Sequence, residues 1–340
     1  MTNRTGKPAP PTSDSVEVDE SQETRGSQLP PEASATAAGA RLQDLLEKTS
    51  RTFALSIPLL PEPTRREVMI AYLLFRIADT FEDAAHWPPE RRIAAIADFR
   101  GLLLNPSPAR ARRLSEKWIA EGASLDDGCR ELVAQVPLVL DAFFALSPAA
   151  IGPVRTHLTR SAEGMAGFVA RTAAGRLALG DLAELRDYCY AVAGIVGEML
   201  TELFLLGRRE LAGVAGYLRE RAATFGEALQ LVNILKDSAV DLAEGRRYLP
   251  AQAPPAAVFS LARRDLGVAG DYILALQRAA APRGLIEFAA LPVQLAWAAL
   301  ERVERQGPGA KISRPEVLRI AQRLRRALDR NEPAVPSTAG

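Results

Sequence analysis

Four polar side chains share one face of a segment that is otherwise apolar, and this pattern limits what the chain can fold into. Gln230, Asn233, Asp237 and Asp241 follow one another at intervals of three or four residues, the spacing that places side chains on one face of an α-helix. The residues that flank them are aliphatic: Leu231, Val232, Ile234, Leu235, Val240 and Leu242. A helix that is apolar on nearly all sides is buried, so we expect this polar face to line an interior cavity.

A second stripe of the same kind lies earlier in the chain. Tyr72, Arg76, Asp79 and Asp83 recur at helical spacing within an apolar segment. Each stripe contains two aspartates four residues apart, and like charges at that spacing destabilise a helix. Buried acids need partners or metals, and a divalent cation with oxygen ligands would compensate both pairs. The sequence therefore predicts a metal site between the two stripes.

Composition narrows the class of protein. The 340 residues include 42 basic and 41 acidic side chains, a net charge of +1, which gives no sign of the basic excess typical of nucleic-acid binding. Two cysteines, Cys129 and Cys189, are too few for a disulfide framework. We find no apolar signal sequence and no run of the ~18 apolar residues that a spanning helix needs. The expected location is the cytoplasm, and peripheral association with a membrane stays open.

The pattern along the chain predicts a single all-α domain at 39–330, built around a central cavity. Residues 1–38 and 331–340 are rich in Pro, Ser, Thr and Gly and are expected to form disordered tails. No alternating β-branched run predicts a strand. Helix formers dominate the rest, and Gly and Pro mark helix ends. The expected helices span 40–55, 64–85, 90–103, 109–121, 126–145, 150–171, 181–206, 208–243 with a break near Gly216, 256–281, 283–305 and 313–329.

Several blocks resemble, in order, those of the squalene and phytoene synthases. They are Thr49-Ser-Arg-Thr-Phe53, Tyr72, Arg76-Ile-Ala-Asp-Thr-Phe-Glu-Asp83, Gly164-Met-Ala166, Tyr188-Cys-Tyr-Ala-Val-Ala-Gly-Ile-Val-Gly197, Gln230 to Asp241, Gly245-Arg-Arg-Tyr-Leu-Pro250 and Glu287-Phe-Ala-Ala-Leu-Pro292. The resemblance spans about 44–320. It implies the isoprenoid synthase fold and the head-to-head condensation of two prenyl diphosphates.

The resemblance also implies roles for particular residues. Mg²⁺ would be held by Asp79, Glu82, Asp83, Asn233, Asp237 and Asp241, and would bridge to the diphosphate. Substrate would contact Arg51, Phe53, Tyr72, Arg76, Gln230, Arg246 and Phe288. Tyr188 matches a tyrosine proposed to steer the carbocation or help remove a proton, and a core tyrosine is an equally good interpretation. Bidentate contacts make arginine well suited to phosphate.

The particular residues in these blocks favour squalene as the product, made from two farnesyl diphosphates by way of presqualene diphosphate. Asn233, Lys236 and Lys311 resemble places where squalene synthases contact NADPH. The alternative is a phytoene or dehydrosqualene synthase of carotenoid biosynthesis, which needs no NADPH. A class I terpene cyclase and a non-catalytic scaffold on the same fold are further alternatives. The intact acidic motifs argue against the scaffold, and the blocks around Tyr188 and Arg246 argue against the cyclase.

A third acidic pair, Glu198 and Glu202, lies outside the resembling motifs. Pairing with nearby arginines explains it better than a metal does. Cys189 has no base partner in the sequence and is expected to be a small buried hydrophobe.

Overall fold

The structure is a computed structural model that describes residues 31–50, 52–124, 126–172 and 177–336, with the backbone alone at 31–36. Within these ranges nearly all regular structure is helical. The elements are α1 (Pro31–Thr49), α2 (Phe53–Ser56), η1 (Ile57–Leu59), α3 (Thr64–Glu82), α4 (Pro89–Leu104), α5 (Pro108–Ala120), α6 (Asp127–Ala134), α7 (Val136–Phe144), α8 (Pro148–Ala170), β1 (Leu177–Ala178), α9 (Leu182–Cys189), η2 (Tyr190–Gly194), α10 (Ile195–Leu205), η3 (Arg209–Val214), α11 (Ala215–Ala243), β2 (Arg246–Arg247), α12 (Pro255–Arg278), α13 (Arg283–Gln306) and α14 (Arg314–Asp329).

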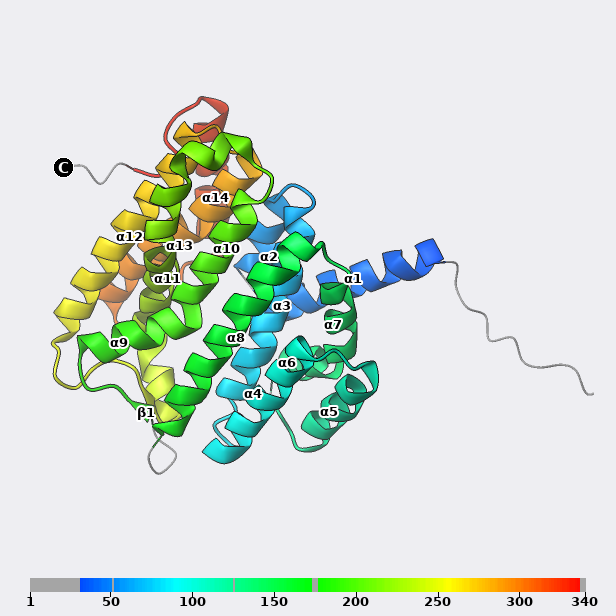
Figure 1. The fold of residues 1–340 in the computed structure, drawn as a ribbon. Helices are drawn as coiled ribbons and strands as arrows, with labels where there is room; N and C mark the ends of the chain where they lie inside the picture. Colours follow the sequence, from blue (N-terminus) through cyan, green and yellow to red (C-terminus); the bar gives the residue numbers. More distant parts are fainter. Residues whose placement is uncertain (1–30, 51, 125, 173–176, 337–340) are drawn as a thin grey trace, which may run out of the picture.

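Two groups of helices meet along α3, α8 and α10. On one side α3 packs against α1, α4, α6 and α7, and on the other α11 packs against α10, α12 and α13. In Figure 1, α8 crosses between the two groups, with α4 to α7 on one flank and α11 to α14 on the other. The all-α architecture predicted from the sequence is confirmed.

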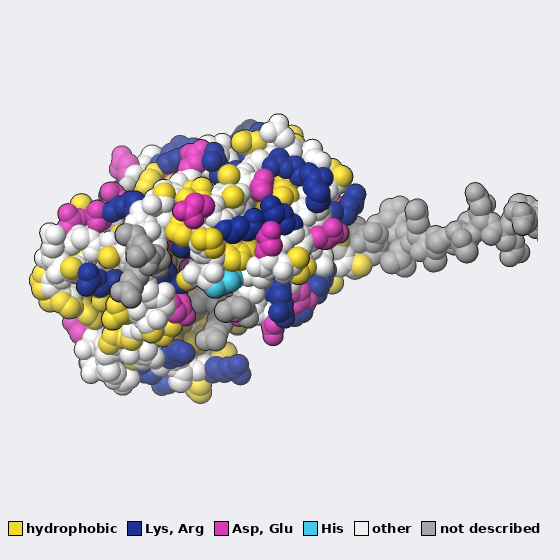
Figure 2. All heavy atoms as spheres, turned by 90° about the horizontal axis from the view of Figure 1, so that it is seen from below, with side chains coloured by type: hydrophobic (Ala, Val, Ile, Leu, Met, Phe, Trp, Pro, Cys, Tyr) yellow, Lys and Arg dark blue, Asp and Glu magenta, His cyan; other side chains and the backbone are white. Residues whose placement is uncertain are grey.

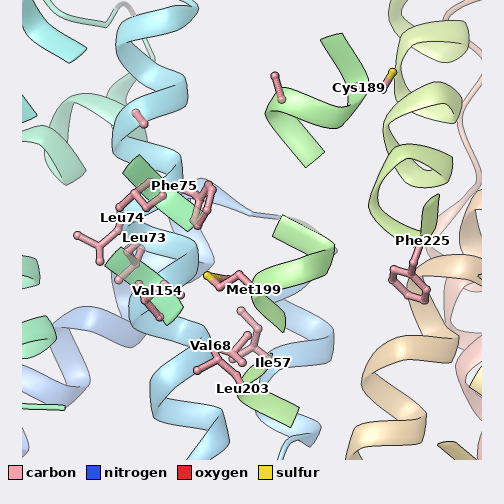
Figure 3. Close-up of a cluster of buried hydrophobic side chains, with 14 of the residues drawn as sticks. Ile57, Val68, Leu73, Leu74, Phe75, Val154, Cys189, Met199, Leu203 and Phe225 are labelled. Carbon is pink, nitrogen blue, oxygen red and sulfur yellow. The ribbon is translucent and has the colours of Figure 1, made fainter. Parts of the chain in front are cut away.

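The core between α3, α8 and α10 is formed by close aliphatic packing. Figure 3 shows Val68 and Leu73 of α3 near Val154 of α8 and Met199 and Leu203 of α10. These five side chains are between 0% and 3% exposed. Burial on this scale is the main stabilising contribution to a fold of this kind.

Glycine allows α10 and α11 to approach until their backbones touch. A side chain at Gly197 would collide with the carbonyl of Ala222, and one at Gly226 with the carbonyl of Ala193. This contact fixes the position of α11, and with it the polar stripe, relative to the π-helical turn η2.

Several predicted helices are divided in the structure. The predicted helix 126–145 separates into α6 and α7, because Pro137 lies at the start of α7 and has no N–H to continue the hydrogen-bond ladder. The predicted 181–206 helix contains the π turn η2. The break expected near Gly216 falls at Val214, where the 3₁₀ turn η3 gives way to α11.

Both predicted tail boundaries need correction. Helix α1 begins at Pro31, inside the segment assigned to the N-terminal tail, and residues 1–30 lie outside the described residues. At the other end Ala334 and Val335 are 1% and 3% exposed. The amide of Ala334 donates to Gln277 Oε1 at 2.9 Å, and its carbonyl accepts from Gln294 Nε2 at 2.5 Å. The buried side chains of Ala334 and Val335 and these two hydrogen bonds attach residues 331–336 to α12 and α13. The amino-acid composition of the segment did not predict this attachment.

Two helical segments in the described part of the chain are long and apolar enough to cross a membrane, Leu182–Leu205 and Arg283–Gln306. Their most apolar stretches are 56% and 67% buried inside the protein. Buried core helices have the same length and composition, so this is weak support for a membrane span.

Candidate active site

Helix α3 presents the first polar stripe, flanked by buried aliphatic and aromatic side chains. Arg76 Nη1 lies 4.0 Å from Asp79 Oδ2. Its Nε is buried with no hydrogen-bond partner among the described residues. The side chains of Asp79 and Asp83 are 35% and 46% exposed, so this stripe remains accessible to solvent.

Burial disfavours the charged form of two acids of α3. Burial raises the pKa of Asp79 to about 7, a rise that Arg76 opposes and Asp83 reinforces. Burial and the Asp83 carboxylate also raise the pKa of Glu82 well above its usual range. A bound cation would reverse both effects, because it favours the charged carboxylate.

Helix α11 presents the second stripe. Lys236 Nζ lies 3.0 Å from Asp237 Oδ2 and donates to Asn233 Oδ1 at 3.4 Å. Gln230 is half-buried one turn earlier, and Asp241 is 15% exposed. Burial raises the pKa of Asp241, against the attraction of Arg246.

The end of α11 is more open than the sequence predicts. Leu231, Val232, Ile234 and Leu235 are buried, but Val240 and Leu242 are 55% and 60% exposed. The expectation that the aliphatic flanks are buried is therefore wrong for the last turn of α11. Within the polar stripe itself, Asn233 is exposed and the side chain of Asp237 is 43% exposed, whereas that of Asp241 is only 15% exposed.

Arg246 joins the two stripes. Its Nη1 lies 4.0 Å from Asp83 Oδ1, and its Nη2 donates to Asp241 Oδ1 at 3.3 Å and to Glu244 Oε2 at 2.5 Å. The parallel pairing of β2 with β1, which places Arg246 opposite Leu177, holds this arginine in place. The sequence reading found no strand, because a two-residue bridge is too short to produce an alternating pattern.

Asp79, Glu82, Asp83, Asp237 and Asp241 do not form a ready-made metal cage. Within the described part of the chain, no three His, Cys, Asp or Glu side chains lie close enough to hold one metal ion together. Mg²⁺ commonly takes only one or two carboxylates and completes its shell with water and substrate phosphate oxygens. Two separate carboxylate pairs suit that mode of binding.

Tyr188 forms a buried pair with a residue that sequence reasoning did not single out. Its hydroxyl donates to the hydroxyl of Tyr248 at 3.1 Å, and the rings stack with centroids 4.6 Å apart. Burial, with the nearby charge of Glu82, raises the pKa of both phenols, so both are neutral near pH 7. Tyr248 lies two residues after Arg246, but this extended segment is too short to give an alternating pattern by which the sequence could have identified it.

Three of the predicted substrate-binding residues form one aromatic wall from α2, α3 and α13. Phe53 lies 5.6 Å from Tyr72 and 6.4 Å from Phe288 between ring centroids. The Tyr72 hydroxyl donates to the carbonyl of Thr49 at 2.8 Å, which anchors the wall to α1. Arg51, predicted to bind substrate beside Phe53, lies outside the described residues.

Arg92, which sequence reasoning did not single out, lies beside the acids of α3. Arg92 of α4 is 7% exposed, and its Nη2 lies 4.0 Å from Glu82 Oε1. With Glu82, Glu244 and Arg246 it lines a cavity of about 10 Å³, roughly the room that one water molecule needs. A single arginine after a proline-rich turn carries no signal that could have identified it.

Both polar stripes lie within a segment of the chain that matches a known protein family. Residues 46–254, more than half of the chain, match the squalene/phytoene synthase family. The chain belongs to this family.

Known members of the squalene/phytoene synthase family share moderate identity with the chain. It is 28% identical to the squalene synthase of Eremothecium gossypii over 212 residues, which cover 62% of this chain and 46% of that protein. It is 30% identical to the Botryococcus squalene synthase of Botryococcus braunii over 200 residues, 59% of this chain and 39% of that protein. The matched segment therefore spans less than half the length of these relatives.

Solved structures of the family show the same fold. A complex of TcSQS with the ligand BPH1237 superposes with a TM-score of 0.66 at 24% identity, over 87% of this chain and 89% of that one. A ligand complex of a dehydrosqualene synthase superposes with a TM-score of 0.55 at 20% identity, over 88% of this chain and all of that one. At these identities the likeness establishes the isoprenoid synthase fold.

Of the three residues predicted to contact a nucleotide, Asn233 and Lys236 lie on α11, and the carbonyl of Lys311 accepts from Arg302 of α13 at 3.0 Å. The amide of Gly309 donates to the carbonyl of Lys236 at 2.7 Å. This bond seats the loop that leads to Lys311 against α11. Lys311 is exposed, whereas Lys236 is already engaged by Asn233 and Asp237.

The third acidic pair is accounted for by arginines. Glu198 pairs with Arg160 at 2.9 Å and Glu202 with Arg219 at 2.7 Å, which confirms the structural interpretation. Cys189 is buried and free, and burial raises the pKa of its thiol, as expected of a small hydrophobe.

Proposed function

We propose that the chain condenses two prenyl diphosphates head to head, and that with farnesyl diphosphate and NADPH it forms squalene by way of presqualene diphosphate. The observation that carries this proposal is the position of Arg246, whose guanidinium reaches Asp83 of one acidic stripe and Asp241 of the other. One site then combines carboxylates from two helices with a cation between them. Family membership supports the same reaction class.

Mg²⁺ fits the donor set. Asp79 and Asp83 on α3, with Asp237 and Asp241 on α11, would hold it, and Glu82 and Asn233 lie beside them. When bound, the metal would neutralise the negative charge of the departing diphosphate. Burial raises the pKa of Asp79 and of Asp241 despite the opposing effects of Arg76 and Arg246, and a bound cation would favour the charged form of both carboxylates.

Arginines would complete the grip on the diphosphate. The Nε atoms of Arg76 and Arg246 are buried without a hydrogen-bond partner among the described residues. A buried donor left unpaired costs ~1 to 3 kcal/mol. A diphosphate oxygen would satisfy such donors through charge-assisted hydrogen bonds.

The carbocation left after ionisation must be kept from water. Phe53, Tyr72 and Phe288 would form an apolar wall, and aromatic faces also attract cations. The neutral Tyr188 hydroxyl, oriented by Tyr248, would steer the cation or help remove a proton from it.

Asn233, Lys236 and Lys311 are proposed to hold the nucleotide, with Lys311 attracting a phosphate. Incubation of the pure protein with farnesyl or geranylgeranyl diphosphate, with and without NADPH, tests the proposal by product identification. We expect squalene from farnesyl diphosphate with NADPH. Phytoene or dehydrosqualene regardless of NADPH would place the chain in the carotenoid branch, and the absence of any condensation product would overturn the proposal.

A further inference from the structure

The segment 311–330 concentrates positive charge that the rest of the chain lacks. It contains seven basic and two acidic residues, whereas the remainder contains 35 basic and 39 acidic residues. The segment therefore carries a net charge of +5 and the remainder −4. Most of it is the helix α14, which packs one face on α13.

Both acids of α14 are used internally. Glu316 pairs with Arg302 at 2.6 Å, and Asp329 pairs with Arg283 at 2.6 Å. Both partners belong to α13, so these bonds hold the helix to the body of the protein and neutralise its only negative charges.

The outer face of α14 is left cationic. Arg319, Arg323, Arg325 and Arg326 are exposed, and none of them forms an ion pair with a described residue. Arg319 and Arg323 border the groove between α13 and α14. Leu318 is 59% exposed and, seven residues before Arg325, lies on the same side of the helix as that arginine. In contrast, both basic and acidic side chains are present on the face seen in Figure 2, at the end of the molecule away from α14.

We propose that this outer face of α14 docks on an anionic phospholipid surface. Four arginines complement the negative surface potential of such a membrane, at ~1 kcal/mol for each basic residue near the surface. An exposed leucine among them can insert into the headgroup region of a membrane. A nucleic acid backbone would offer this apolar side chain no comparable contact. The choice of a lipid partner also rests on the proposed function, because a C30 hydrocarbon product is insoluble in water and must leave into a lipid phase.

Vesicle sedimentation of the full chain tests the inference without any turnover. Vesicles of phosphatidylcholine alone are compared with vesicles containing phosphatidylglycerol, at low and high NaCl. We expect binding only to the anionic vesicles, weakened by salt. The variant Arg319→Gln/Arg326→Gln should lower the partition coefficient roughly 30-fold, since two interactions of ~1 kcal/mol are lost.

Matched variants test whether vesicle binding depends on this face of α14 or only on the total positive charge of the protein. Arg112→Gln/Arg113→Gln on α5 removes the same charge from two exposed residues and should leave binding within about twofold. Leu318→Ser should weaken binding several-fold at high salt, where the electrostatic part is screened. All variants should keep the wild-type thermal midpoint, because every altered side chain is exposed.

Three outcomes would overturn the inference: equal binding to neutral vesicles, an equal loss in the α5 control, or no binding to anionic vesicles. Tight salt-dependent binding to a DNA duplex without vesicle binding would assign the face to a nucleic acid instead. Vesicle binding by a protein that makes no condensation product would separate this inference from the proposed function.

Discussion

Asp83 at the end of α3 and Asp241 in the last turn of α11 share one guanidinium, that of Arg246. The two aspartates lie 158 positions apart in the sequence, and β2, which holds Arg246, links them. Arg246, whose side chain is 15% exposed, opposes the rise that burial produces in the pKa of Asp241.

Substitution of Arg246 should therefore affect the proposed reaction strongly. Arg246→Gln removes the positive charge from the diphosphate site, and loss of one such electrostatic contact typically costs ~10²- to 10³-fold in kcat. Arg246→Lys should recover only part of this, because lysine cannot contact two groups in a fork. Steady-state kinetics with farnesyl diphosphate provide the measurement, and a kcat within fivefold of wild type for Arg246→Gln would contradict the assignment.

The metal-free protein should become less stable as the pH rises through the titration of Asp79. With the pKa at about 7 in the folded state against 3.8 in the unfolded chain, the folded protein retains a proton that the unfolded chain releases. Stability is then lost as the pH rises from about 4 to about 7. Asp79→Asn should remove this slope and raise stability in EDTA at pH 8 by about 1 kcal/mol, allowing for solvent screening of a side chain that is 35% exposed.

Denaturant titration at several pH values, with and without Mg²⁺, checks this expectation. Asp79→Asn should also lose most turnover, as should Asp237→Ala, and EDTA should abolish the activity of the wild type. An identical pH slope in wild type and Asp79→Asn would show that another group controls the stability. Full activity in excess EDTA would exclude the metal.

The sequence predicted those parts of the site that repeat with the helix period. Both polar stripes and the all-α fold follow from the spacing of polar and apolar residues, because residues three or four positions apart lie on the same face of a helix. Tyr248 and Arg92 did not stand out, because each contributes a single side chain from a short segment. The exposure of Leu242 and the burial of Val335 depend on where neighbouring helices end, which no local pattern encodes.

The hydroxyl pair of Tyr188 and Tyr248 should show strong energetic coupling. Tyr248→Phe leaves the buried Tyr188 hydroxyl without its described partner, which costs ~1 to 3 kcal/mol, whereas removal of both hydroxyls can be nearly neutral. The double variant should thus be more stable than the sum of the two single losses predicts. A double-mutant cycle from urea unfolding measures this coupling, and strict additivity would show that the hydrogen bond contributes nothing.

The segment after α14 should contribute to global stability. Val335 is 3% exposed, so Val335→Asp places a charge in an apolar contact and should cost at least about 2 kcal/mol. Pro336→Ser changes the exposed next residue and should stay within about 0.5 kcal/mol. Thermal unfolding distinguishes them, and equal midpoints for wild type and Val335→Asp would mean that this segment does not hold to α12 and α13 in solution.

A substitution at Lys311 should affect the hydride step and leave the condensation step unchanged. Lys311 is exposed on a loop seated against α11 at Lys236. Lys311→Ala should raise the NADPH concentration needed for squalene roughly ten- to a hundredfold, because a charge-assisted contact is worth ~1.5 to 3 kcal/mol. The rate of the first condensation should stay nearly unchanged, since that step needs no hydride. Lys117→Ala, which removes another exposed lysine on α5, serves as the control. Product analysis over an NADPH titration decides the matter: presqualene diphosphate should accumulate in the Lys311 variant at low NADPH, and an unchanged NADPH requirement would remove this lysine from the nucleotide site.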